Sequence, residues 1–167
     1  MHTVYRDLET TGLDTAYHAI LEVGILDDAG AVLLDTLVRP VRHRQWPESQ
    51  HIHGITPAAV AAAPTHAEVR PRIIEAVARA RVVIYNAPFD SGFLVPELAA
   101  AGEVVCAMRP FAEAFGEWDI GRDCWHWQKL HVAAAHVGFV WPGSAHRAIH
   151  DCAATRAVWQ WLQQVGQ

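Results

Sequence analysis

The pattern of apolar positions divides the chain into a first part with strand character and a second part with helical character. Strands are expected at Thr3–Glu9, Tyr17–Leu26 and Ala31–Arg39, where β-branched and other apolar residues are frequent. The turn sequence DDAG at residues 27–30 separates the last two of these segments. Connections this short predict that the strands are antiparallel neighbours in one sheet.

The second part alternates helices with short apolar strands. Thr56-Pro57 has the form of a helix start, and the apolar spacing of Ala67–Arg79 predicts an amphipathic helix. Arg81–Tyr85 (RVVIY) predicts a buried strand, and Val104–Met108 predicts a further short strand. Antiparallel strands followed by a β-α-β-α order indicate an α/β fold with a mixed sheet and helices on its faces. No repeat or linker divides the sequence, so we expect a single domain over residues 1–167.

Composition is that of an ordinary globular protein. Hydrophobic residues make up 51 % and charged residues 19 %, and no apolar run approaches the roughly 18 residues needed to cross a membrane. The N-terminal sequence MHTVYRDLET lacks the features of a signal peptide, so we expect a cytoplasmic location and no membrane partner. Cys106, Cys124 and Cys152 have no CxxC spacing, which argues against a disulfide framework and a zinc site.

The formal net charge of −5 is, on average, unfavourable for a nucleic-acid-binding protein. A site that gathers carboxylates around metal ions also makes a protein acidic, while its working surface still attracts phosphate. Net charge therefore neither supports nor excludes nucleic-acid binding. The positions of the acidic residues are more informative than their number.

Two carboxylates lie close together on the first predicted strand. Asp7 and Glu9 are two residues apart, so both side chains leave the same face, about 7 Å apart. Carboxylates this close repel each other unless a cation neutralises them, and a divalent metal would do so directly. For an isolated D-x-E pattern, however, a solvated edge strand is the commoner explanation.

Asp90 follows the predicted strand Arg81–Tyr85 at the head of a predicted helix that continues to about Ala101. Apolar residues follow it at helical spacing, namely Phe93, Leu94, Leu98 and Ala101. Capping this helix is a common alternative use of an aspartate.

Asp151 has a similar place at the start of the last predicted helix. Its apolar stripe consists of Ala154, Val158, Trp161 and Val165 and contains no Lys or Arg. An aspartate that faces inward without a positive partner is costly. A metal ion shared with Asp7 and Glu9 is the simplest partner.

His146 precedes Asp151 by five residues, a spacing that on one continuous helix would place the two side chains about 140° apart. The turn residues Pro142, Gly143 and Ser144 instead allow His146 to lie in a loop directly before the helix, above the carboxylates. Considered alone, such a histidine is more often an ordinary surface residue.

Several segments resemble the motifs of the DEDDh 3′→5′ exonucleases. Asp7–Leu13 (DLETTGL) is similar to the first motif, D-x-E-T-T-G, and Asn86–Asp90 (NAPFD) to the second, N-x-x-F-D. His146–Asp151 (HRAIHD) is similar to the third, H-x-A-x-x-D, whose histidine spacing distinguishes this group. His53–Thr56 (HGIT) also resembles a segment common in these enzymes. The order and separations agree over nearly the whole chain, so motifs that are weak individually indicate one site together.

The resemblance implies a ribonuclease-H-like α/β fold, with a mixed five-stranded sheet of three antiparallel plus two parallel strands and helices on both faces. It also implies two Mg²⁺ or Mn²⁺ ions, about 4 Å apart, that activate a water and stabilise the leaving 3′ oxygen. On this basis Asp7 bridges the ions, Glu9 and Asp151 bind the water-activating ion, and Asp90 serves the second ion. His146 would accept the proton of the attacking water.

The resemblance also places the terminal nucleotide beside the first motif. Backbone and hydroxyl groups of this motif would contact the sugar, Leu13 would contact the base, and residues from the other segments would form the pocket wall. The expected substrate-binding residues are Thr10, Thr11, Gly12, Leu13, His53, Ile55, Asn86 and Phe89.

Within the group, the compact length and the segments His51–Thr56, Val105–Met108 and His146–Cys152 resemble bacterial exonuclease X. This implies a DNA substrate, with single-stranded or frayed 3′ ends preferred. Proofreading polymerase subunits, ribonuclease T and oligoribonuclease share the core motifs. A polymerase partner and an RNA substrate therefore remain open, as does a non-catalytic nucleic-acid-binding module, against which the intact site residues argue.

The sequence departs from the family pattern at three positions. Arg6 stands where an apolar residue usually precedes the first aspartate, Tyr85 replaces a frequent histidine, and Ala107 replaces a frequent threonine or aspartate. A further feature is the tryptophan-rich stretch Trp118–Trp127. It could be a stacking platform for bases, although packing in the core is the commoner use of such side chains.

Overall fold

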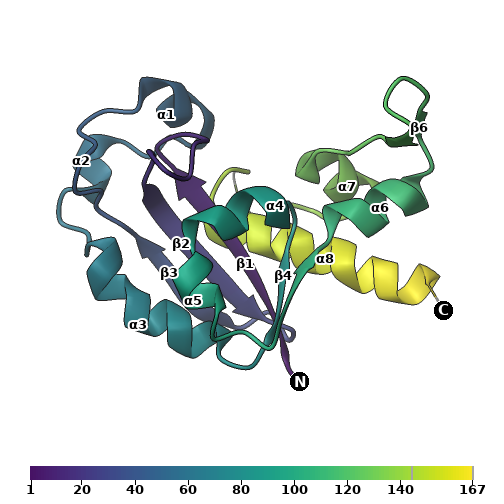
Figure 1. Cartoon of the computed structure of the whole chain (residues 1–167), viewed down its shortest axis with the longest axis horizontal. Helices are drawn as coiled ribbons and strands as arrows, with labels where there is room; N and C mark the ends of the chain where they lie inside the picture. The colour runs from purple at the N-terminus through teal and green to yellow at the C-terminus, as the bar shows by residue number, and fades with distance from the viewer. Residues whose placement is uncertain (144, 167) are drawn as a thin grey trace.

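The computed structural model describes residues 1–143 and 145–166, and a five-stranded sheet in the order β3-β2-β1-β4-β5 forms its centre (Figure 1). β1 (Thr3–Thr10), β2 (Ile20–Asp27) and β3 (Val32–Leu37) are antiparallel neighbours. β4 (Arg81–Ile84) pairs with β1, and β5 (Glu103–Cys106) pairs with β4, both in parallel. The predicted mixed sheet of three antiparallel plus two parallel strands is confirmed.

Helices cover both faces of this sheet, as predicted (Figure 1). On one face lie α3 (His66–Val77), α4 (Ala87–Asp90) and α5 (Val95–Leu98), which pack on Val4 and Leu8 of β1. On the other lie α6 (Met108–Phe115), α7 (Leu130–His136) and α8 (Ala148–Val165), which pack around Tyr5. Because successive side chains of a strand leave opposite faces, β1 contributes to both cores and directs Asp7 and Glu9 to the α8 face.

Two short helices cover the end of the sheet beyond β2 and β3. α1 (Pro47–His53) was not predicted, whereas Thr56 caps α2 (Pro57–Val60) as expected, because its hydroxyl accepts a hydrogen bond from the Ala59 N–H at 3.1 Å. A separate small core lies beneath them, where Trp46 Nε1 donates to the carbonyl of Ile55 at 2.7 Å.

The helix predicted from Asp90 to about Ala101 is wrong as a continuous element. The structure divides it into α4, a 3₁₀ turn at Ser91–Phe93 and α5, and Asp90 is the last residue of α4. Pro96 lacks an N–H and is accepted only in the first turn of a helix, so α5 starts anew at Val95. The predicted apolar spacing still holds, because Leu94 and Leu98 are buried in the core.

α8 agrees with the prediction at its start and departs from it at its end. Ala154 and Val158 are buried as expected, whereas Val165 is 54 % exposed. Leu162, four residues after Val158, continues the buried stripe instead, since residues four apart lie on the same face of a helix. Figure 1 shows this last part of α8 extending beyond the sheet.

A two-stranded hairpin, β6 (Trp118–Asp119) and β7 (Cys124–Trp125), lies apart from the main sheet and was not predicted (Figure 1). Of the turn expected at Pro142–Ser144, Ser144 lies outside the described residues. His146 does lie in the loop directly before α8. Among the described helices none is both long and apolar enough to cross a membrane.

Candidate active site

A close approach between α8 and the sheet brings the third motif over the first. Gly24 of β2 lies opposite Asp7 of β1, and a Cβ atom at Gly24 would lie only 2.6 Å from the backbone carbonyl carbon of Ala148. The thiol of Cys152 donates to the Gly24 carbonyl at 3.1 Å. Only a glycine permits this contact, so the first turn of α8, with Asp151, is held directly above the carboxylates of β1.

Three of the predicted site residues form a compact group of potential metal ligands. One ligand atom each from Glu9, His146 and Asp151 lies within 4.8 Å of the others. The His146 backbone N–H donates to Asp151 Oδ1 at 3.3 Å, and His146 has a left-handed φ of 61°. A non-glycine residue held in this costly conformation is typical of a functional position.

The carboxylates of the three motifs also perturb one another strongly. Burial, followed by repulsion from Asp151, raises the pKa of Glu9 to about 8. Burial and repulsion from Asp90 raise the pKa of Asp7 well above its usual range, and burial raises the pKa values of Asp90 and Asp151 to about 6. This cluster of buried oxygen donors lacks sufficient positive charge, and Mg²⁺ and Mn²⁺ prefer such donors. The residues present therefore fit a divalent cation.

Arg6 supplies a buried positive charge to this cluster. Its side chain is fully buried, and Nη1 lies 3.9 Å from Asp90 Oδ1. Among the described residues, none forms a hydrogen bond with its guanidinium nitrogens. The guanidinium lowers the pKa values of both Asp90 and Asp7 and so opposes the effect of burial. This departure from the family pattern thus lies next to the predicted metal ligands.

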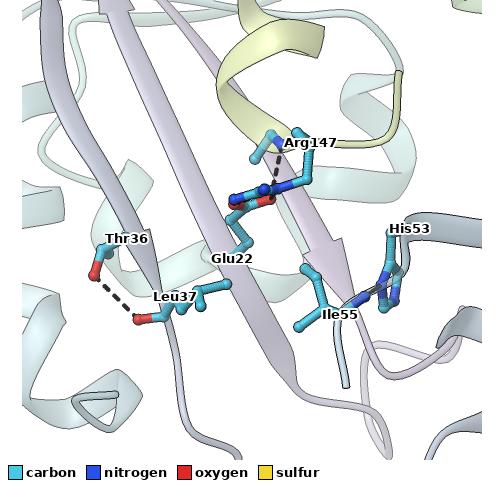
Figure 2. A network of polar contacts seen from close by, with 7 residues as sticks. Glu22, Thr36, Leu37, His53, Ile55 and Arg147 are labelled. Carbon is cyan, nitrogen blue, oxygen red and sulfur yellow. Dashed lines mark hydrogen bonds and ion pairs between the residues drawn. The ribbon is translucent and has the colours of Figure 1, made fainter. Parts of the chain in front are cut away.

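A second buried charge, Glu22, fixes the start of α8 (Figure 2). Its side chain is fully buried on β2, and both of its carboxylate oxygens accept hydrogen bonds from Arg147 Nε, at 3.0 and 3.2 Å. The Ala148 backbone N–H also donates to Glu22, at 2.9 Å. Because Arg147 directly follows His146, this clamp sets the position of the histidine loop. Sequence reasoning missed Glu22, although a charged residue within the apolar strand ILEVGILD was a usable signal.

The segment expected to receive the terminal nucleotide forms a tightly bonded loop after β1. The Thr10 hydroxyl donates to the Gly12 carbonyl at 2.8 Å, and the Ala19 N–H donates to the Thr11 hydroxyl at 2.9 Å. A Cβ atom at Gly12 would lie 2.5 Å from the His18 ring, so glycine is required for this packing. Leu13 is 78 % exposed and lines the adjacent cleft. The hydroxyls of Thr10 and Thr11, which are expected to contact the sugar, thus also stabilise the loop.

His53 is buried behind this loop and braces it. Its Nδ1 accepts from the Ile55 N–H at 3.0 Å (Figure 2), so Nε2 carries the proton and donates to the Thr10 carbonyl at 3.2 Å. Burial lowers the pKa of His53, which favours this neutral form. Ile55 is buried in the small core and does not line the cleft, whereas the exposed Ile52 does.

The candidate site opens into a cleft of about 750 Å³. Of the predicted residues, Leu13, Asn86, His146 and Asp151 line it. Phe89 instead packs edge-on against Phe93, with ring centroids 5.5 Å apart. The lining residues that sequence reasoning did not assign to the site include Tyr85, Met108, Lys129, His131 and Trp141. Lys129, His131 and Trp141 come from segments without a motif, so only the fold brings them to the site.

Comparisons with known proteins agree with this geometry. A family model described as "Exonuclease" matches residues 4–159. The chain is 36 % identical to the uncharacterized exonuclease CP81 of Escherichia phage 186, over 93 % of this chain and 84 % of the relative. It is 31 % identical to the DNA polymerase III subunit epsilon of Rickettsia conorii, over 59 % of this chain and 45 % of that protein. The chain thus spans most of the first relative and less than half of the second.

Solved structures with the same fold include two exonucleases in complex with nucleic acid. A structure of exonuclease X in complex with 5′ overhanging duplex DNA has a TM-score of 0.73 and 24 % identity, and covers 98 % of this chain and 92 % of that one. Escherichia coli exonuclease I in complex with a dA16 oligonucleotide has a TM-score of 0.77 and 18 % identity, and covers 98 % of this chain and 41 % of that one. The predicted ribonuclease-H-like architecture is confirmed by these similarities.

Proposed function

Because the chain belongs to the DEDDh group of the exonuclease family, we propose that it is a metal-dependent 3′→5′ exodeoxyribonuclease. It would release nucleoside 5′-monophosphates from the 3′ ends of DNA. The observation that carries this proposal is the convergence of Glu9, His146 and Asp151 within 4.8 Å. Asp7 and Asp90 lie near the same cluster, because the charge of Asp151 raises the pKa of each of them.

Asp7, Glu9, Asp90 and Asp151 would hold two Mg²⁺ or Mn²⁺ ions. When bound, such ions polarise the scissile phosphate and lower the pKa of a bound water. His146 is exposed in the loop above the carboxylates, and it would accept the proton of the attacking water. The hydrogen bond from its backbone N–H to Asp151 keeps it beside the metal ligands.

The cleft supports a terminal nucleotide with a free 3′ end. Leu13 offers an exposed apolar side chain to a base, and Asn86 lines the same cleft. Lys129, which is exposed in this cleft, places positive charge where a phosphate would pass. Bases must separate to enter such a site, so single-stranded or frayed ends should be cut fastest.

DNA is the proposed substrate, since the two solved structures above contain DNA and this chain shares their fold. A replicative polymerase is a candidate partner, because the Rickettsia relative is a polymerase subunit. Co-purification of this chain with a polymerase from the same cell would test this partner, and a monomeric chain that binds no polymerase would exclude it.

A time course on a single-stranded DNA labelled at its 5′ end tests the proposed reaction. A ladder that shortens one nucleotide at a time, with nucleoside 5′-monophosphates as products, is expected. A parallel RNA of the same sequence is the matched control for the substrate. Faster RNA cleavage would replace the DNA assignment with an RNA exonuclease, and background turnover on both with Mn²⁺ would favour a non-catalytic binding module.

A further inference from the structure

The hairpin of residues 117–127, named here the tryptophan hairpin, carries aromatic side chains away from the core. Trp118 of β6 lies opposite Trp125 of β7, and their rings meet edge to face with centroids 4.9 Å apart. Trp118 is 48 % exposed and Trp127 is 56 % exposed. The expectation that this stretch packs in the core is therefore wrong for these two residues.

Exposed indoles are unusual on a surface that binds nothing, because their large apolar area is better removed from water. Polar residues at these positions would allow the same short backbone pairing between β6 and β7. The rings of Trp125, His126 and Trp127 line a hollow of about 390 Å³. A hollow with aromatic walls offers flat surfaces to a planar ligand.

This hollow and the cleft of the candidate active site share one lining residue. Trp127 lines both the hollow of the hairpin and the cleft that contains His146 and Asp151. A further indole, Trp141, lies on the cleft side. Aromatic surfaces thus extend from the hairpin to the proposed reaction centre, and Figure 1 shows the hairpin projecting on the side of α6 and α7.

Positive side chains accompany these rings. Arg122 lines the hollow, its side chain is 78 % exposed, and its Nε lies 3.7 Å from Asp119 Oδ2, an exposed pair that contributes little. Lys129 follows in the cleft. Asp119 is the one acidic residue that lines the hollow among the described residues. Aromatic planes with interspersed cations are the combination that binds single-stranded nucleic acid without sequence preference.

We propose, on the basis of the proposed function, that the tryptophan hairpin binds the single strand upstream of the terminal nucleotide. Bases would stack on Trp127 and then on the Trp118–Trp125 pair, while Arg122 and Lys129 contact the phosphates. Only unpaired bases expose both faces for stacking, so the hairpin selects a single strand and not a duplex.

The test compares substrates that do and do not reach the hairpin. KM is measured for a thymidine dodecamer and for the p-nitrophenyl ester of thymidine 5′-monophosphate, which has no upstream nucleotides. Trp127→Ala should raise KM for the dodecamer by a factor about ten times larger than the factor by which it raises KM for the ester. Trp127→Phe keeps an aromatic plane and should restore most of the loss. Val41→Ala, an 81 % exposed residue outside the hairpin, serves as the control.

Melting temperatures show whether each variant is folded. If Trp127→Ala fails to fold, Trp118→Ala and Arg122→Ala carry the test with the same comparison. Equal effects on the dodecamer and on the ester would overturn the proposed strand path. Absence of wild-type hydrolysis on both substrates would instead contradict the proposed function, so the two failures are distinguishable.

Discussion

The guanidinium of Arg6 lies against the carboxylate of Asp90, with 3.9 Å between Nη1 and Oδ1. Both side chains are buried, and Arg6 projects from the face of β1 opposite to Asp7 and Glu9. An arginine at this position brings a fixed positive charge to the acidic cluster from inside the fold. It partly neutralises carboxylates that a divalent cation would otherwise have to neutralise alone.

Replacing Arg6 should make the protein depend more on metal. In Arg6→Leu, Asp90 loses its buried counter-charge, so the metal-free protein should melt at a lower temperature than the wild type. Saturating Mn²⁺ should then raise the melting temperature by more in the variant than in the wild type. Arg81→Leu, which removes an exposed ion pair with Glu103, is the control and should change both values little. Equal Mn²⁺ shifts in wild type and Arg6→Leu would refute this role.

The stability of the metal-free protein should depend on pH through Glu9. Its pKa is raised from about 4.5 to about 8, so the folded state favours the protonated form. That stabilising effect is complete below pH of about 4.5 and is lost as the pH rises through about 8. In EDTA the wild-type melting temperature should therefore fall between about pH 4.5 and 8, and the fall should be smaller in Glu9→Gln.

The control for this experiment is Glu75→Gln, since Glu75 is exposed on α3. It should show the wild-type pH dependence. A Glu9→Gln profile that runs parallel to the wild type across this range would mean that Glu9 does not titrate there.

The clamp between Glu22 and Arg147 should matter for both stability and catalysis. Glu22→Ala leaves the Ala148 N–H without its acceptor and Arg147 without its partner, so the free energy of unfolding should fall by about 2 kcal/mol. This loss of unfolding free energy is smaller than the loss expected for a fully buried ion pair, because the Arg147 side chain is 42 % exposed. The cleavage rate should fall as well, since the loop with His146 is no longer fixed. Denaturant unfolding measures the first effect and single-turnover kinetics the second.

Glu103→Ala is the matched control, because it removes the exposed carboxylate of the Arg81 pair. Glu22→Gln keeps an acceptor for the Ala148 N–H and should recover part of the rate. A Glu22→Ala variant with wild-type kcat would limit the clamp to a structural role.

His146→Ala should slow cleavage by about a hundredfold, which is typical for the loss of a general base. The backbone N–H of residue 146 remains, so its hydrogen bond to Asp151 and the binding of Mn²⁺ should persist. Titration of Mn²⁺ followed by melting temperature checks this point. His51→Ala, which changes an exposed histidine of α1, is the control. Near-normal cleavage by His146→Ala at neutral pH would mean that another group accepts the proton.

Local signals in the sequence predicted much of the fold. Frequent apolar residues and the turn at residues 27–30 were enough to predict β1, β2 and β3, and Thr56 needed only its place before a proline. The helix after Asp90 failed as a continuous element, because periodicity records which residues face the core and not whether the backbone is interrupted. Pro96 was the local signal for that interruption.

The site was predictable where its residues lie in motifs. Glu9, His146 and Asp151 lie together in the structure, and Leu13 and Asn86 line the cleft. The remaining contributions depend on tertiary packing that one sequence does not encode locally. Lys129 and Trp141 reach the cleft only because α7 and the loop before α8 fold against it, and the contact of Arg6 with Asp90 crosses between two separate elements.

The most direct test of the proposed metal-dependent site is the rate at which Asp7→Asn shortens a 5′-labelled single-stranded DNA in the presence of Mn²⁺. The substitution removes a metal-binding charge and also relieves repulsion within the cluster. The variant should therefore remain folded, with a melting temperature in EDTA at or above that of the wild type, while turnover falls to background. Cleavage by Asp7→Asn at the wild-type rate, or full wild-type activity in EDTA, would contradict the account.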